Sequence, residues 1–209
     1  LYTDEGKDKL AALLKDADIL VENFRPGVLE KMGLGNAYLN TLNPELIVAS
    51  VNGYGSAGPY ADRPSFDFIA QAMSGFMSVT GEVDGAPMRA APPMADLIAG
   101  LYCAFGAVTA LNARNRTGKG QYVETSLTNS LISLMAFLSA DYFAGGEVPA
   151  RSGNNHAIVA PYGLFKAKDG AIAVAPSNDT YVERFLDAVR LKHLLDDNRF
   201  RTNADRMRN

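Results

Sequence analysis

Cysteine and histidine are scarce in this sequence. Cys103 is the only cysteine, and His156 and His193 are the only histidines. A single cysteine excludes an internal disulfide framework and a metal site built from several cysteines. No three ligands converge as catalytic zinc requires, so we expect no metal. Cys103 lies in an apolar helical pattern, where a buried inert thiol is the default. His193 falls at a charged helix end, and only His156, in a polar loop, is a candidate base for a hydrolase.

Strong net charge and long apolar runs are also lacking. The net charge of −3 gives no general attraction to nucleic acid or anionic membranes. The longest apolar run, residues 97–111, is shorter than the roughly 20 residues of a membrane span and predicts a buried core helix. No signal-peptide pattern opens the chain. We therefore expect a cytoplasmic protein with no nucleic-acid or membrane partner. Both ends resemble the middle of a longer polypeptide, so we expect a fragment.

Short apolar runs alternate with helical patterns along residues 1–144. Runs at residues 18–22, 45–50 and 121–126 are typical of buried strands, and amphipathic patterns such as residues 5–15 and 65–75 lie between them. Strands that alternate with helices favour a parallel sheet covered on both faces. The predicted fold class is therefore α/β, with the ligand site at the carboxyl edge of the sheet.

The pattern changes after a glycine-rich stretch. Residues 145–156 have the composition of a linker. Beyond it, Asp169-Gly170 lies between two apolar runs, which is a strong hairpin signal. The prediction is that residues 1–144 form part of a large domain and residues 157–209 begin a smaller α+β domain. Single helices are expected over residues 127–143 and 180–195.

Gly53, Gly55 and Gly58 match the dinucleotide-binding pattern of three glycines after a strand. That motif requires a helix to open directly from the loop. Pro59 and Pro64 follow instead and leave little room for a helix. We therefore expect a flexible loop on the substrate side of the sheet.

Asp96 stands where the apolar helix after Pro93 should begin. Asp is a favoured N-cap, because its carboxylate accepts bonds from unpartnered backbone N–H groups. The alternative is a nucleophile held at the positive end of a helix dipole. A carboxylate that attacks a thioester gives a reactive mixed anhydride, and N–H groups at a helix start or a glycine loop can stabilise the oxyanion. Phosphates of an activated acyl carrier could bind Arg25 and Lys31.

Five short segments give the sequence a specific resemblance when they are taken in order. They are Glu22-Asn-Phe-Arg-Pro-Gly27, Gly53-Tyr-Gly-Ser-Ala-Gly-Pro59, Gln71-Ala-Met-Ser-Gly75, Ala95-Asp96-Leu-Ile-Ala-Gly100 and Arg116-Thr-Gly-Lys-Gly-Gln121. From about Asp18 to the carboxyl end the chain resembles the class III CoA-transferases, a family that also contains formyl-CoA and carnitine CoA-transferases and the 2-methylacyl-CoA racemases.

The resemblance implies an enzyme that moves CoA from an acyl-CoA donor to a carboxylic acid, with Asp96 as the covalent nucleophile. It implies a Rossmann-like large domain, a small domain and an interlocked homodimer. It also implies that the first βα unit and the returning carboxyl-terminal segment of the family lie outside this sequence. The implied contacts to coenzyme A are Asn23, Phe24, Arg25, Lys31, Arg63, Phe66 and Leu127.

Two departures from the family pattern concern the reaction. The racemase branch has a histidine, used for proton transfer at the α-carbon, at the position of Phe66, so transferase is preferred over racemase. The glycine-rich loop of the formyl-CoA branch has no clear counterpart near residues 154–161, which leaves the acyl group and the acceptor open. The alternatives are an acyl-CoA racemase or epimerase and a non-catalytic CoA-binding or dinucleotide-binding module.

Overall fold

The computed structural model describes residues 3–209, which separate into two compact units. Unit 1 contains the chain up to Met77 together with Arg89–Pro149, and unit 2 contains Ser78–Met88 and Ala150–Asn209. The segment 78–88, which the sequence analysis placed with residues 1–144, thus makes its contacts within unit 2. Compact units need not fold independently, so the predicted domain boundaries stay a prediction.

Unit 1 is built on a parallel sheet of the strands β1 (Ile19–Glu22), β2 (Ile47–Asn52) and β3 (Tyr122–Ser126). The order is β1-β2-β3, and both pairs are parallel, with Ile19 beside Ile47 and Val48 beside Tyr122. The α/β class and the parallel sheet are therefore confirmed.

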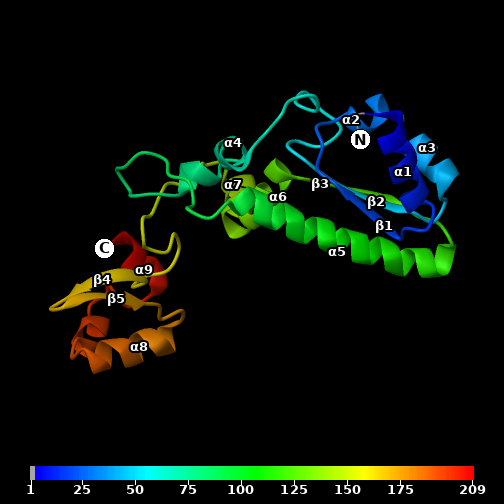
Figure 1. The fold of residues 1–209 in the computed structure, drawn as a ribbon. Helices are drawn as coiled ribbons and strands as arrows, with labels where there is room; N and C mark the ends of the chain where they lie inside the picture. Colours follow the sequence, from blue (N-terminus) through cyan, green and yellow to red (C-terminus); the bar gives the residue numbers. More distant parts are fainter. Residues whose placement is uncertain (1–2) are drawn as a thin grey trace. The chain divides into compact units, whose positions relative to one another are not determined.

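Helices cover both faces of this sheet (Figure 1). The first face carries α1 (Asp4–Leu14) and α3 (Asn36–Leu42), and α2 (Val28–Lys31) follows the first strand. The second face carries α5 (Met94–Thr117). Side chains alternate across a strand, so neighbouring residues of β2 serve different clusters. Val48 packs with Leu14 and Leu39 of the first face, whereas Ala49 packs with Cys103 and Ala107 of α5.

Only one stripe of α5 is buried, which corrects the prediction of a buried core helix. The stripe consists of small residues, and they are Ala95, Ala99, Cys103, Ala107 and Ala110. Small side chains let the helix backbone approach the sheet closely. The opposite face is apolar and exposed, with Leu101 62%, Phe105 72% and Val108 63% accessible. By length and composition alone this 24-residue helix could cross a membrane, a test that the core helices of many globular proteins also pass.

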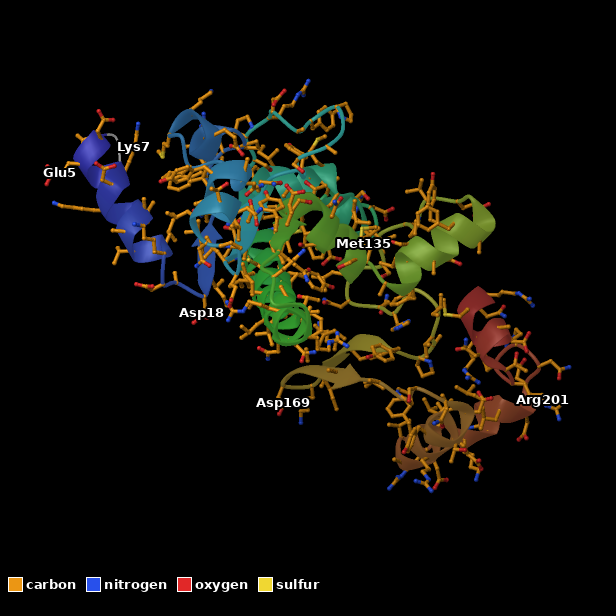
Figure 2. All side chains as sticks on the ribbon, turned by 90° about the vertical axis from the view of Figure 1, so that its right-hand side faces the viewer. Glu5, Lys7, Asp18, Met135, Asp169 and Arg201 are labelled. Carbon is orange, nitrogen blue, oxygen red and sulfur yellow. The ribbon has the colours of Figure 1, made fainter. Side chains whose placement is uncertain are left out.

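A second correction concerns residues 127–143, which were predicted as one helix. The structure has two, α6 (Leu127–Leu134) and α7 (Phe137–Gly145). Ala136 between them has φ of 45° and ψ of −114°, a positive-φ conformation that is rare for a non-glycine residue and that ends the helix. Met135, labelled in Figure 2, precedes this break. No glycine or proline marks it, so the helical pattern alone could not have located it.

Two short helical elements complete unit 1 and the start of unit 2. Helix α4 (Asp67–Met73) packs against α5 and α6. It is followed by a 3-10 turn, η1 (Phe76–Val79), within the region predicted as a long loop.

Unit 2 contains the predicted hairpin of β4 (Gly163–Ala167) and β5 (Gly170–Val174), which pair antiparallel with Asp169 at the tip (Figure 2). The helix predicted over 180–195 is wrong in its second half. Helix α8 (Asp179–Ala188) ends before Arg190, whose φ of 61° turns the chain, and the 3-10 turn η2 (Lys192–Asp196) follows. A last helix, α9 (Asn203–Arg208), was not predicted.

Candidate active site

The carboxyl ends of the three parallel strands meet at one edge of the sheet. Helix α5 precedes β3 in the chain and runs back across the sheet, so its amino end reaches this same edge. A pocket of about 720 Å³ lies there, within unit 1. Open α/β sheets bind their ligands at this place.

Asp96 and six of the seven predicted coenzyme contacts line this one pocket. The six are Asn23, Phe24, Arg25, Arg63, Phe66 and Leu127. They come from loops that are far apart in the sequence, and the strand order brings them together. Lys31 is the exception, because its side chain is exposed on α2 and does not belong to the pocket wall.

The loop after β1 is shaped by the last residue of that strand. The Glu22 carboxylate accepts a hydrogen bond from the Phe24 backbone N–H at 2.9 Å. Gly27 then adopts φ of 77°, a conformation that glycine tolerates, where α2 begins. The turn leaves Asn23 and Arg25 exposed in the pocket wall, where a guanidinium can bind phosphate.

The glycine loop after β2 is tied to the next strand, β3. The Glu124 carboxylate accepts bonds from the Asn52 amide and the Ser56 hydroxyl, at 2.6 and 2.8 Å. The Gly53 carbonyl accepts from the Thr128 hydroxyl at 3.0 Å. The next helix starts only at Asp67, so the loop does not open into a helix as a dinucleotide-binding loop does. Gly53 instead lines the pocket.

A close approach fixes glycine at position 53. A Cβ atom there would lie 2.5 Å from the Ser65 Cβ, closer than two carbon atoms can pack. The contact brings the segment Arg63–Phe66 back against the end of β2, and this segment forms part of the pocket wall. The Arg63 guanidinium stacks on the Tyr60 ring at 4.5 Å, which holds the cation near the pocket.

Asp96 does not cap α5, contrary to the structural alternative in the sequence analysis. The helix begins at Met94 after Pro93, which places Asp96 third in the helix, and no side chain of the N-cap residue bonds to it. The cap comes from Asp67, whose Oδ1 accepts a hydrogen bond from the Ala95 N–H at 2.8 Å. The Asp96 carboxylate is thereby left exposed in the pocket.

The first N–H groups of α5 are already engaged. Met94 donates to the Pro92 carbonyl, Ala95 to Asp67, and Leu97 to the Pro93 carbonyl. Of the two predicted sources of oxyanion donors, a helix start or a glycine loop, these three N–H groups of the helix start are therefore not available. The positive end of the helix dipole still favours an anion at Asp96.

Two effects raise the pKa of the Asp96 carboxyl above its ordinary value. Partial burial in the pocket wall is the larger one, and repulsion by the Asp67 carboxylate adds to it. Both disfavour the charged form. A carboxylate with a raised pKa is more basic and hence a better nucleophile, as long as it remains ionised.

Gly100 lies one helical turn after Asp96 and also lines the pocket. A Cβ atom at this position would meet nothing within 4 Å. Glycine in a helix interior is unfavourable relative to alanine, and no packing contact accounts for it. Its effect is to keep the helix surface beside Asp96 open to a ligand.

A family model described as CoA-transferase family III matches residues 1–209. The chain belongs to this family. It is 38% identical to the succinate–glutarate CoA-transferase of Agrobacterium fabrum, over 99% of this chain and 52% of that protein. It is 37% identical to the acetyl-CoA:oxalate CoA-transferase of Acetobacter aceti, over 100% of this chain and 57% of that protein.

A solved structure of a CAIB/BAIF family protein from Brucella suis is 37% identical and superposes with a TM-score of 0.83, over 99% of this chain and 55% of that one. The chain thus spans about half the length of the curated relatives that it matches. The names of these relatives favour neither a racemase nor a non-catalytic binding module.

Sequence reasoning gave no role to three residues of this site: Asp67, Glu22 and Gly100. Asp67 carried one signal, an acidic residue directly before an apolar helical pattern, which is typical of a first helical turn. Nothing in the sequence indicated that it caps a different helix, 28 positions further along the chain. Glu22 was predicted to end a strand, and both Glu22 and Gly100 belong to segments of the family resemblance, but neither was given a role.

Proposed function

We propose that the protein is a CoA-transferase in which Asp96 is the covalent nucleophile. The observation that carries the proposal is that the Asp96 carboxylate shares one pocket with six residues expected to contact coenzyme A. Its raised pKa and its place in the first turn of α5 suit a carboxylate that attacks a carbonyl carbon. Membership of the CoA-transferase family supports the same reaction class.

We assign acyl-CoA binding to the two loops that approach the pocket from β1 and from the glycine loop. Arg25 and Arg63 supply positive charge for phosphates, and Phe24, Phe66 and Leu127 supply apolar surface for the pantetheine arm. Lys31, exposed on α2 outside the wall, is proposed to contact only a phosphate that extends beyond the pocket.

The first half of the reaction consumes the donor. The Asp96 carboxylate attacks the thioester carbonyl, a C–O bond forms, the C–S bond breaks and CoA leaves as a thiolate. The product on the enzyme is a mixed anhydride. The thiolate then attacks the aspartyl carbonyl, which gives an aspartyl-CoA thioester and releases the donor acid as a carboxylate.

The second half repeats these steps in reverse with the acceptor. The acceptor carboxylate attacks the aspartyl-CoA carbonyl, expels the CoA thiolate and forms a new mixed anhydride. The thiolate attacks the acceptor's carbonyl carbon, so that the new acyl-CoA leaves and the Asp96 carboxylate is regenerated. No net proton, electron or water is consumed, in keeping with a site that needs no redox cofactor.

We further propose a short dicarboxylate as one of the substrates. Named relatives act on succinate and glutarate, on oxalate, and on succinyl-CoA with mesaconate. Succinyl-CoA as donor and glutarate as acceptor are therefore the first pair to assay.

The assembly and location follow the family resemblance and remain proposals. A Rossmann-like large domain, an interlocked homodimer and a cytoplasmic location are proposed for the full-length protein. The exposed apolar face of α5, with Leu101, Phe105 and Val108, is consistent with a surface that is covered in a larger assembly. Light scattering of the full-length protein tests the dimer, since a monomer would contradict it.

Asp96→Asn tests the nucleophile. Full-length protein is incubated with succinyl-CoA, quenched with hydroxylamine and analysed by peptide mass spectrometry. Wild type should carry a hydroxamate at Asp96, whereas the Asn variant should carry none and lose CoA transfer to glutarate by about a thousandfold or more, as expected when a nucleophile is removed.

The matched control is Asp8→Asn, which removes the same charge from the exposed side of α1. It should retain both the adduct and the activity. Full turnover by the Asp96→Asn variant, or a hydroxamate at another residue, would contradict the proposal.

A further inference from the structure

Asp67 joins two helices through its two carboxylate oxygens. It is the first residue of α4, yet its Oδ1 accepts from the Ala95 N–H of α5 at 2.8 Å. Its Oδ2 accepts from the Gln71 side-chain amide at 2.7 Å. Ala95 is fully buried and directly precedes Asp96. The direction of the first turn of α5 is therefore fixed by a side chain from another element.

Gln71 presents a hydrogen-bond donor to Asp67. It is fully buried, and its Oε1 accepts from the Ala90 N–H at 2.8 Å. Because this bond fixes the orientation of the amide, its Nε2 points at Asp67 as a donor. Both oxygens of Asp67 thus face donors, and a carboxylate can accept through each of them.

The charged groups around Asp96 come from few elements. β2 and α6, which pack on α5, carry no charged side chain, and Glu124 of β3 is occupied by Asn52 and Ser56. The pocket wall adds Glu22, Arg25 and Arg63. The group whose charge raises the pKa of Asp96 is Asp67.

We infer that Asp67 is a positioning residue, which fixes the first turn of α5 and holds a second negative charge beside the nucleophile. This inference rests on the proposed function of Asp96. The repulsion makes the Asp96 carboxylate a stronger base and is relieved when acylation neutralises it. The cap ensures that the gain in reactivity is not lost to disorder of the helix start.

Asp67→Asn is the test, because the amide oxygen can still accept from Ala95 while the charge is gone. The amide nitrogen of the variant then faces the Gln71 donor, so some loss of stability is expected as well. With succinyl-CoA and glutarate and the full-length protein, kcat should fall about five- to tenfold, because Asp96 loses the repulsion that makes its carboxylate a stronger base, with KM for succinyl-CoA nearly unchanged. The acid limb of the kcat–pH profile should move to lower pH, because Asp96 loses its charged neighbour. A purely structural role would lower the yield or the melting temperature and leave this limb in place.

Asp8→Asn again provides the charge-matched control and should reproduce the wild-type profile. If the Asp67→Asn variant does not fold, wild type carries the test, since added salt screens the repulsion and should shift the same limb downward. An acid limb that moves with neither the substitution nor salt overturns the inference. The proposed function fails separately, if Asp96→Asn remains active.

Discussion

At the scale of single residues, Asp96 should destabilise the fold at neutral pH. Its pKa is raised in the folded protein, so the folded state binds its proton more tightly than the unfolded chain does. Stability is then lost as the pH rises from the ordinary aspartate value of about 3.9 through the raised value. Ionisation of Asp96 lowers the free energy of unfolding, because burial and the Asp67 carboxylate both disfavour the charged form.

Asp96→Asn should therefore unfold at a higher urea concentration than wild type at pH 7. The difference should fade below about pH 4, where Asp96 is protonated in both the folded and the unfolded state. Urea titrations at the two pH values measure this. Equal midpoints at pH 7 would show that the raised pKa has no effect on stability.

Gly100 presents the same conflict between stability and activity. Gly100→Ala should stabilise the protein by about 0.5–1 kcal/mol, because alanine favours the helix and its Cβ meets no atom within 4 Å. The new methyl group enters the pocket beside Asp96, so kcat/KM for succinyl-CoA should fall by about tenfold. Thermal unfolding and steady-state kinetics give the two values.

Gly145→Ala is the control, since Gly145 also belongs to a helix and a Cβ there also meets no atom within 4 Å, but it lies outside the pocket. It should leave kcat/KM unchanged. Unchanged kinetics in Gly100→Ala would mean that this helix surface is not used by the substrate.

At the scale of elements, the packing of α5 on the sheet depends on how closely two backbones approach. A Cβ atom at Gly106 would lie 2.6 Å from a methyl carbon of Val123 on β3. The helix can rest on the strand at this distance only because position 106 has no side chain. The same helix carries Asp96 at its amino end.

Gly106→Ala should thus destabilise unit 1 by about 1–3 kcal/mol, the usual cost of overpacking. Val123→Ala makes room for the added methyl group, and the double variant should be more stable than the sum of the single effects by about 1 kcal/mol or more. Chemical denaturation of the four proteins completes the cycle. If the two changes in unfolding free energy were strictly additive, positions 106 and 123 would not be in steric contact.

Element boundaries show where local pattern was sufficient. The strands of the parallel sheet and the helices α1 and α4 follow from apolar periodicity and from glycine and proline signals, and the structure has them within about two residues. The breaks at Ala136 and Arg190 were missed, because both are non-glycine residues with positive φ. A sequence of good helix formers carries no local signal for such a turn.

At the scale of the whole molecule, the segment 78–88 is held within unit 2 by Arg151. Each nitrogen of its guanidinium donates to a different backbone carbonyl. The acceptors are the carbonyls of Ser78, Glu82 and Gly85, at N···O distances of 3.2, 3.2 and 2.6 Å. One cation thus organises a loop that lies more than 60 positions away in the sequence. A hydrogen bond to a loop carbonyl contributes more to stability when its donor is charged than when the donor is neutral.

Arg151→Met keeps an apolar stem and removes every donor. Backbone amides of residues 78–88 should then exchange hydrogen at least about tenfold faster. The reason is that the loss of these hydrogen bonds lowers the local free energy of unfolding by about 1–3 kcal/mol. Hydrogen exchange with mass spectrometry on the full-length protein resolves this segment. Lys166→Met, on the exposed hairpin, is the control and should leave the exchange unaltered.

The sequence by itself determined the α/β class, the parallel sheet, the hairpin and the family, because these depend on local periodicity and on short ordered motifs. It also gave Asp96, Arg25 and the glycine loop as candidates from local pattern, and the remaining pocket residues through resemblance. Tertiary structure alone decided that Asp67 caps α5, that Asp96 is left free, and that Lys31 lies outside the pocket wall. Those outcomes depend on which distant chain segments meet at the sheet edge, a property that no local window of residues contains.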